Sequence, residues 1–442
     1  HTRSCLVSWA RDVYKRQVMD KKTLSNIFKG DKVIWMIFFF LCIISVVEVF
    51  SASSGLTYKS GSYFSPLIKH LGILLMGIFC MVITLNIKCK YFKILTPFML
   101  VISFITLIWV FFAGQSTNGA QRWVSFIGIQ FQPSEIAKGT LVLATAQILS
   151  ALQTDHGADK NAFKFILIVC AFIVPLIGLE NLSTAALLCL VILLMMVIGR
   201  VPMRQLGKLM GVTLALILVI LAGVMLLGTD RGDVETSKNM TEQVAQQKKD
   251  EGLLGKIFHR ADTWKSRIDK FTSSKEVTPA EVDLDTDAQV AHANIAIASS
   301  NVVGKGPGNS VERDFLSQAF SDFIYAIIIE ELGVEGAVAV AVLYIMLLFR
   351  TGRIASRCEN NFPALLAMGL ALLLVTQALF NMCVAVGLAP VTGQPLPLIS
   401  KGGTSTMINC IYVGVILSVS RSAKKKGEPG QGETKTEVSI TE

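Results

Sequence analysis

Residues 316–325 read Leu316-Ser317-Gln318-Ala319-Phe320-Ser321-Asp322-Phe323-Ile324-Tyr325, and here a long polar segment becomes an apolar helix. The sequence puts Asp322 at the water-facing end of that helix. Charged side chains near membrane depth are costly and usually face a cavity or a partner rather than lipid. Asp322 is therefore the first residue that we expect to carry chemistry. The alternative is a carboxylate that only favours the helix start beside Ser321.

The composition is typical of a membrane protein. Of 442 residues, 52% are hydrophobic and 17% are charged, whereas a soluble chain carries roughly a quarter charged residues. The mean hydropathy is +0.56. About ten apolar blocks are long enough to cross a bilayer as helices, near 33–51, 66–87, 94–113, 134–152, 163–180, 182–199, 207–228, 322–349, 362–387 and 404–420. The predicted fold class is an all-α polytopic integral membrane protein with one large extracytoplasmic loop.

Lys and Arg residues in the short connections predict the orientation. They follow the second, sixth, eighth and tenth blocks: Lys88, Lys90, Lys93, Arg200, Arg204, Lys208, Arg350, Arg353, Arg357, Lys424, Lys425 and Lys426. Positive charge marks cytoplasmic connections. Both termini are therefore expected in the cytoplasm, and the connections after the third, seventh and ninth blocks are expected outside. The net charge of +9 is mostly this orientation signal, and no nucleic-acid patch is present.

The chain is expected to divide into three parts. Residues 1–18 have neither an apolar core nor a cleavage site, so they are interpreted as a non-native leader. Residues 19–421 are expected to form the membrane domain, and 422–442 a cytoplasmic tail. Residues 229–321 form the large extracytoplasmic loop, in which helical spacing near 253–271 predicts an amphipathic helix. That helix would lie on the membrane surface or pack on the protein's own outer face.

The loop after the third block predicts a first group of substrate contacts. Arg122 and Trp123 lie in it, and Glu135 and Lys138 follow at the next helix start. Glu135 and Lys138 are three residues apart and share a helix face, so they either pair with each other or leave Lys138 to bind an anionic head group. Trp123 would be an interfacial anchor or a platform for a sugar.

Two further segments contribute candidates. Gln289 to Ser310 is helix-like and ends in glycines, which allow either a tight turn or close approach to a ligand. Gln289 and Ser310 are predicted substrate contacts. Residues 389–405 are rich in Pro and Gly yet moderately apolar, as in a re-entrant wall of a site, and Ser400 and Lys401 are its candidates.

Three more features bound the chemistry. Glu180-Asn181-Leu182-Ser183 forms a polar turn between the fifth and sixth blocks, or part of a shared cavity. Glu330, Glu331 and Glu335 continue into the eighth block, where they must face the bundle. Nine cysteines are scattered without metal-type spacing, so buried free thiols are expected.

Five separated motifs together resemble the SEDS family (shape, elongation, division and sporulation), and within it the FtsW cell-division branch. The likeness spans essentially 19–421. In chain order the motifs are Asn118-Gly119-Ala120 with Arg122-Trp123, Gln132-Pro133-Ser134-Glu135 with Lys138, the Gly304/Gly306/Gly308/Ser310 pattern, Asp322-Phe323 with Glu330-Glu331-Leu332-Gly333, and Pro397-Leu398-Ile399-Ser400 with Gly402-Gly403.

The resemblance implies a peptidoglycan glycosyltransferase that polymerises lipid II at the outer face of the cytoplasmic (inner) membrane, at the division septum. It implies a class B penicillin-binding transpeptidase and other division proteins as partners. It also implies that Asp322 matches the family's essential catalytic aspartate. The chain departs from the family at Ser317-Gln318, where Pro-Glu is usual, at Phe320, where His is usual, at 180–183, where a Glu-Pro-Asp turn is usual, and at Lys401, where Tyr is usual.

The expected mechanism is one inverting displacement. Lipid II carries its anomeric carbon on a polyprenyl pyrophosphate, which is already a good leaving group, so one general base, Asp322, suffices. Arg122, Lys138 or Lys401 would supply positive charge to the pyrophosphate. No resident cofactor or metal cluster is indicated, and a divalent cation (Mg or Mn) would be shared with the substrate.

Two other function classes compete with this interpretation. A transporter that flips a lipid-linked sugar would also have polytopic helices and intramembrane carboxylates. However, the polar motifs gather on the outer side, and no internal repeat is visible. A non-catalytic scaffold for the division transpeptidase is the second rival. Glycan synthesis by the purified protein with its partner separates all three.

Overall fold

The computed structural model describes residues 29–58, 65–113, 115–117, 120–126, 129–155, 157–213, 288–316 and 320–423. The predicted leader at 1–18, the amphipathic helix near 253–271 and the tail beyond 423 lie outside these residues. Only the last part of the predicted 229–321 loop is described, from 288 onward.

The described chain is mostly α-helical, as expected. All the predicted apolar blocks except the seventh coincide with helices over most of their length; the seventh is helical at 203–213 and then leaves the described residues. The helices are α2 (Lys32–Tyr58), α3 (Ser65–Asn86), α4 (Cys89–Ala113), α5 (Pro133–Ala151), α6 (Lys160–Glu180), α7 (Leu182–Ile198), α11 (Ala288–Ala298), the 3-10 turn η1 (Glu312–Asp314), α12 (Ile324–Ala355), α13 (Asn361–Ala385) and α14 (Thr404–Ser422).

Six of the described helices are long and apolar enough to cross a membrane: α2, α3, α4, α6, α12 and α13. Large apolar side chains point outward from this bundle. Phe79, Phe98, Phe172 and Phe349 are each more than half exposed. Such side chains are stable on the surface only where that surface faces hydrocarbon. The chain is therefore a multi-pass membrane protein.

Helices α5 and α13 form the centre of the bundle. Helix α5 packs against α4, α6, α7, α13 and α14, and most of its residues are buried. Helix α13 is buried along most of its length. A helix that is buried on all sides can carry small and polar residues that lipid would not tolerate. The central position of α5 explains why it is less apolar than the outer helices.

Short strands lie between the helices. β1 (Gln115–Thr117), β2 (Ala120–Phe126) and β3 (Ile129–Phe131) form an antiparallel sheet between α4 and α5. In this sheet Trp123 is opposite Gln115, and Val124 is opposite Phe131. β4 (Gln153–Thr154) and β5 (Gly157–Ala158) form a second, smaller pair after α5. These strands are the exception to the all-α prediction.

Helix α12 is broken, which corrects the prediction of one continuous span. Gly333 has φ 70° and ψ −172°, so the helical axis changes direction there. The Tyr325 hydroxyl donates to Ala337 O over 3.1 Å. In a straight helix these residues would be about 18 Å apart, beyond the reach of a tyrosine side chain. Residues 324–332, the half-helix, therefore turn away from the axis of 334–355.

Glu330 and Glu331 are buried, as predicted, whereas Glu335 is exposed, so the prediction that Glu335 faces the bundle is wrong. Glu335 lies just after the break at Gly333, on the part of α12 whose direction has changed. Residues 323–331 are all buried, so the half-helix is enclosed by protein.

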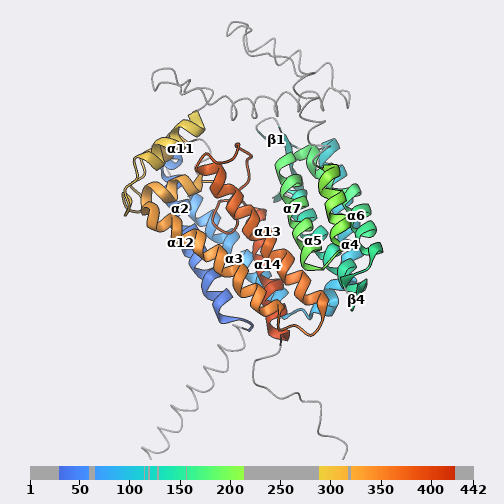
Figure 1. The fold of residues 1–442 in the computed structure, drawn as a ribbon. Helices are drawn as coiled ribbons and strands as arrows, with labels where there is room; N and C mark the ends of the chain where they lie inside the picture. Colours follow the sequence, from blue (N-terminus) through green and yellow to red (C-terminus); the bar gives the residue numbers. More distant parts are fainter. Residues whose placement is uncertain are drawn as a thin grey trace, which may run out of the picture.

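The two ends of the bundle differ. The amide of Asp31 donates to Ser420 Oγ over 2.9 Å, which places the start of α2 beside the end of α14. Figure 1 shows α11 and β1 at the opposite end of the molecule, with β4 near the end that holds residues 31 and 420. The predicted site residues gather at the α11 and β1 end.

Candidate functional site

Asp322 lies in a turn just before the half-helix, and three successive carbonyl groups of this turn are bound by other segments. Lys401 N donates to Phe320 O over 2.9 Å. Ser400 Oγ donates to Ser321 O over 2.6 Å. Asn381 Nδ2 donates to Asp322 O over 2.9 Å. This carbonyl clamp fixes the main chain of residues 320–322 without using the Asp322 carboxylate.

The Asp322 carboxylate is half-buried. Ser321 Oγ donates to Asp322 Oδ1 over 3.0 Å. The half-helix begins two residues later, at Ile324, and its first residue has no side-chain cap. A helix N-terminus stabilises a nearby negative charge. The Asp322 carboxylate therefore lies next to the N-terminus of the half-helix.

The loop between α13 and α14, which the sequence analysis proposed as a re-entrant wall of the site, forms the other half of the clamp. Ser400 is buried and also accepts from Leu396 N over 2.8 Å, so one hydroxyl ties the loop to the Asp322 turn. The Lys401 ammonium lies 4.9 Å from the ring centroid of Phe320. Burial, with a smaller effect of the charge on Lys69, lowers the pKa of Lys401. Lys401 is thus a half-buried cation beside the candidate base.

Helix α13 holds the clamp together, which sequence reasoning missed. Gln377 and Asn381 are one turn apart on α13 and are both buried. Asn381 Nδ2 also donates to Gln394 O over 2.7 Å, and Gln377 Nε2 donates to Pro395 O over 3.2 Å. Two amides inside a continuous apolar helix are the signal that could have identified them, because buried amides must be bonded.

Glu135 and Lys138 pair with each other, which was one of the two alternatives. Lys138 Nζ lies 2.9 Å from Glu135 Oε1, and each side chain is 2% exposed. Lys138 Nζ also donates to Gln377 Oε1 over 2.8 Å. Through Gln377 and Asn381 on one face of α13, this pair is joined to the Asp322 turn. The sequence motifs around 135 and 322 therefore meet at α13.

A second polar chain that sequence reasoning missed supports the Lys401 loop from α2 and α3. Ser45 Oγ donates to Ile399 O over 2.7 Å and lies 2.9 Å from His70 Nε2. Because the single proton of Ser45 goes to Ile399, His70 Nε2 carries the proton of the other bond. Both side chains are fully buried.

The turn at 180–183 has the turn chemistry that was one of its two predicted roles, and it also bonds to another loop. Asn181 caps α7, since its Oδ1 accepts from Ser183 N over 3.1 Å and from Thr184 N over 3.4 Å. Gln394 Nε2 donates to Thr184 Oγ1, and Asn181 Nδ2 donates to Thr392 O over 3.4 Å. The turn is therefore joined to the same loop that carries Ser400 and Lys401.

The remaining predicted contacts lie on other segments. Ser310 is buried against Glu330 and Glu331, the carboxylates near the far end of the half-helix. Gln289 lies at the start of α11 and is half-buried. Arg122 and Trp123 lie on β2, but their side chains are outside the described part of the chain. Among the residues that the structure describes, no group of three or more His, Cys, Asp or Glu side chains could hold a metal ion.

Comparisons with known proteins show the family of the chain. The FTSW_RODA_SPOVE family, described as “Cell cycle protein”, matches residues 31–425. A Halomonas elongata relative named “Probable peptidoglycan glycosyltransferase FtsW” is 30% identical over 407 residues, covering 89% of this chain and 92% of the relative.

Two solved structures share the fold. The Thermus thermophilus rod shape determining protein RodA has a TM-score of 0.59 at 20% identity, covering 91% of this chain and 100% of RodA. A structure reported under “Structural coordination of polymerization and crosslinking by a peptidoglycan synthase complex” has a TM-score of 0.64 at 22% identity, covering 89% of this chain and 98% of the other. At these identities the two structures show only that the fold is shared. The family match, in contrast, covers nearly the whole described bundle. The chain therefore belongs to the FtsW/RodA/SpoVE family of cell cycle proteins, the SEDS family.

Proposed function

We propose that this protein is a peptidoglycan glycosyltransferase that polymerises lipid II during cell division, at the outer face of the cytoplasmic membrane and at the septum. Its partner would be a class B penicillin-binding transpeptidase. The FtsW relative carries the name of this activity. The observation that carries the proposal is the carbonyl clamp, because it holds Asp322 at the junction of the sequence motifs.

Asp322 would act as the general base in a single displacement. Its carboxylate accepts the proton of the acceptor sugar hydroxyl as that oxygen bonds to the anomeric carbon of the donor. The bond from the anomeric carbon to the pyrophosphate oxygen breaks, and the pyrophosphate leaves with the electron pair. Because the attack comes from the face opposite the leaving group, the configuration inverts.

Lys401 is the described cation that best suits the departing pyrophosphate. It is half-buried, lies in the loop that clamps Asp322, and is held by its ring contact with Phe320. Lys138 fits this role less well, because Glu135 and Gln377 already bind its ammonium. A fixed cation at a developing negative charge stabilises the transition state without reorganisation. A divalent ion, if used, would be shared with the pyrophosphate.

A lipid-linked-sugar flippase is the second candidate, and the break in α12 favours it. Broken helices line the binding sites of many transporters. In this protein, however, the half-helix packs against α11, which lies at one end of the molecule (Figure 1). A non-catalytic scaffold for the transpeptidase would need neither Asp322 nor Lys401.

The first prediction tests the base. Asp322→Asn keeps the size of the side chain and removes its ability to take a proton. We expect the variant to insert and purify as the wild type does, yet to form glycan strands from lipid II at least about 100-fold more slowly. The assay is strand length by gel electrophoresis, using protein purified with its transpeptidase partner.

The control is Glu335→Gln, a charge-removing change at an exposed carboxylate on α12. It should polymerise at the wild-type rate. A near wild-type rate for Asp322→Asn would refute the general-base role. Movement of fluorescent lipid II across liposomes without polymer formation would favour the flippase. Failure of the wild-type protein in both assays would favour the scaffold.

A further inference from the structure

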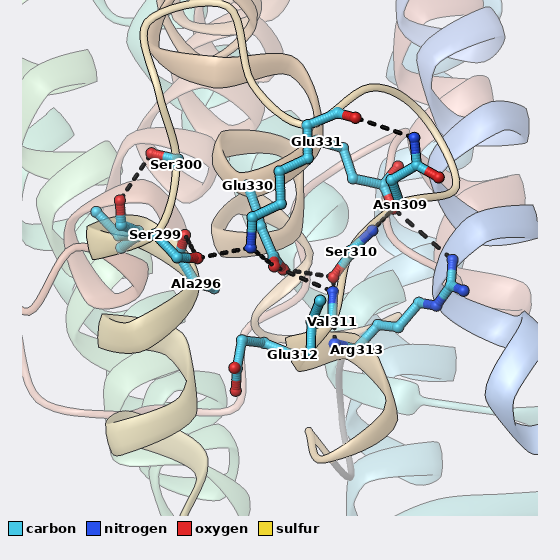
Figure 2. Close-up of polar contacts among 12 residues, drawn as sticks. Ala296, Ser299, Ser300, Asn309, Ser310, Val311, Glu312, Arg313, Glu330 and Glu331 are labelled. Atoms are coloured by element: carbon cyan, nitrogen blue, oxygen red, sulfur yellow. Dashed lines mark hydrogen bonds and ion pairs between the residues drawn. The ribbon is translucent and has the colours of Figure 1, made fainter.

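The half-helix is held at both of its ends, and the second attachment has no role in the proposed reaction. The carbonyl clamp grips residues 320–322 at its start. At its end, Glu330 and Glu331 reach into the segment 302–313 between α11 and η1, as Figure 2 shows. We call this second attachment the carboxylate anchor. It consists of Glu330, Glu331 and the groups of 302–313 that bind them.

The main chain of the anchor replaces hydrogen bonds that the break in α12 removes. Because the helix stops at Gly333, Glu330 O and Glu331 O lose their helical donors. Lys305 N donates to Glu330 O over 3.0 Å, and Gly306 N donates to Glu331 O over 2.8 Å. A buried carbonyl group without a hydrogen-bond donor costs free energy, so the break in α12 requires segment 302–306 to supply these donors.

Two glycines allow this close approach. Gly304 has φ +79° and Gly333 has φ +70°. A Cβ atom on Gly304 would lie 2.3 Å from Gly333 N, and one on Gly333 would lie 2.2 Å from Val302 O. Each glycine therefore makes room for the backbone opposite it.

The two glutamate side chains of the anchor are fully buried, and each accepts several hydrogen bonds. Glu330 accepts from Lys305 Nζ over 2.6 Å, from Val311 N over 3.0 Å and from the Ser310 hydroxyl. Figure 2 shows these bonds converging on the Glu330 carboxylate.

Glu331 accepts from Gly308 N over 2.9 Å, from Ser310 N over 3.3 Å and from the hydroxyl of Ser51 on α2. Both glutamate side chains are 0% exposed. A buried carboxylate with this many donors is a rigid attachment point.

We propose that Glu330 and Glu331 are positioning residues, which hold Asp322 in reach of the acceptor hydroxyl through the half-helix. This inference rests on the proposed function. The half-helix is short and buried on every side, so a shift at its anchored end moves its other end as one body. A misplacement of about 1 Å can lower turnover about 100-fold. The anchor thus acts on the reaction without touching the substrate.

The test compares Glu331→Gln and Glu330→Gln with the exposed control Glu335→Gln. Both oxygens of Glu331 accept from backbone N–H groups, so Glu331→Gln presents an N–H group to one of them. Glu330→Gln removes the negative charge that pairs with Lys305. Each change therefore loosens the anchor. We expect kcat for lipid II polymerisation to fall about 10- to 100-fold, while KM stays within about two-fold. Glu335→Gln should change neither. Unchanged kcat in both variants would overturn the proposal.

A milder variant covers the case in which the glutamine variants fail to fold. Lys305→Ala removes one donor from the partly exposed edge of the anchor, where the Lys305 side chain is 27% exposed. Its kcat should fall about three- to ten-fold at constant KM. A rise in KM with constant kcat would contradict a positioning role.

A second measurement reads position rather than activity. Cysteine is placed at 322 (Asp322→Cys), and its rate of modification by a water-soluble maleimide is measured by mass spectrometry of the peptide that contains it. Adding Glu331→Gln should change that rate at least about three-fold, because the accessibility of position 322 changes. Adding Glu335→Gln should not. Equal rates in all three proteins would overturn the proposal.

The two proposals fail in different ways. If Asp322→Asn is inactive while both glutamine variants behave as wild type, only the positioning role is lost. If Asp322→Asn is active, the general-base role is lost, and the labelling rates alone then decide whether the anchor sets the position of residue 322.

Discussion

Distant segments bind the main chain of the Asp322 turn. The sequence could therefore predict Asp322 itself but not the residues that hold it. Its carboxylate stood out because a charge at the start of an apolar helix is costly. Asn381, which binds its carbonyl oxygen, is 59 residues away along the chain. No local pattern specifies such a partner, since the bond exists only after α13 and the half-helix have packed together.

The surroundings of Lys401 could not be predicted from the sequence either. The sequence identified it as a cation in an irregular loop, but its neighbours Phe320 and Lys69 come from other segments. Burial and the Lys69 charge lower the pKa of Lys401, so it loses its proton at a lower pH than an ordinary lysine. The charged form is the one that binds a pyrophosphate.

The pH dependence of polymerisation should therefore report on Lys401. Its loss of charge would set the alkaline limb of kcat/KM for lipid II, below the pH at which an ordinary lysine titrates. Lys401→Arg should move this limb upward by more than about one pH unit, because a guanidinium stays charged. Lys69→Gln should also move it upward, by a smaller amount. Lys93→Arg, at an exposed site on α4, is the control and should leave the limb in place.

Helix α12 shows what element-level patterns can and cannot predict. Its apolar run correctly predicted a helix and a membrane span. A glycine inside such a run is usually tolerated, so Gly333 alone did not indicate a break. The break depends on Gly304 and on the amides of 305 and 306, which come from a segment that sequence analysis interpreted only as glycine-rich.

Gly333→Ala should destabilise the protein by more than about 2 kcal/mol, because alanine is strained at this positive φ and its Cβ would collide with Val302 O. The measurement is the thermal midpoint in detergent. The matched control is Gly352→Ala in the same helix, where a Cβ would meet nothing within 4 Å. That change should be neutral or stabilising by up to about 1 kcal/mol. Equal midpoints for the two variants would contradict the need for a break.

At the scale of the whole molecule, the positions of most helices in the described part of the chain followed from the apolar blocks alone. The packing order did not. The sequence does not reveal that α5 and α13 are central, because small and polar residues are as consistent with an outer helix as with an enclosed one. The contacts between α2 and α14, at the end remote from Asp322, also could not be predicted from the sequence, because they join residues nearly 400 positions apart.

Asp31 ties three helices together at that remote end. It caps α2 through Val33 N at 2.9 Å, and its carboxylate lies 2.7 Å from Arg350 Nη2 on α12. Burial alone would raise the pKa of Asp31, but the hydrogen bonds and charge of Arg350 lower it below its usual value. The stabilisation is therefore present at neutral pH and is lost as the pH falls through this lowered pKa.

Asp31→Asn keeps the capping oxygen and removes the charge, so it isolates the ion pair. We expect a loss of about 1–2 kcal/mol at pH 7, seen as a lower thermal midpoint in detergent. The difference from wild type should vanish in acid, once Asp31 itself is protonated. Asp155→Asn, at an exposed turn, should leave the midpoint unchanged at every pH. A difference that persists in acid would assign the effect to something other than charge.

The ion pair inside α5 also constrains how this gene can diverge. Replacing either Lys138 or Glu135 alone leaves the other charge unpaired inside the bundle. This should lower the free energy of unfolding by about 3–5 kcal/mol, whereas replacing both with apolar residues can be nearly neutral. A lineage that acquires one change is therefore trapped between reversion and a compensating second mutation. Residues 135 and 138 are therefore expected to change together during evolution. Gln377, which accepts a hydrogen bond from Lys138, restricts which pairs of residues are tolerated at these two positions.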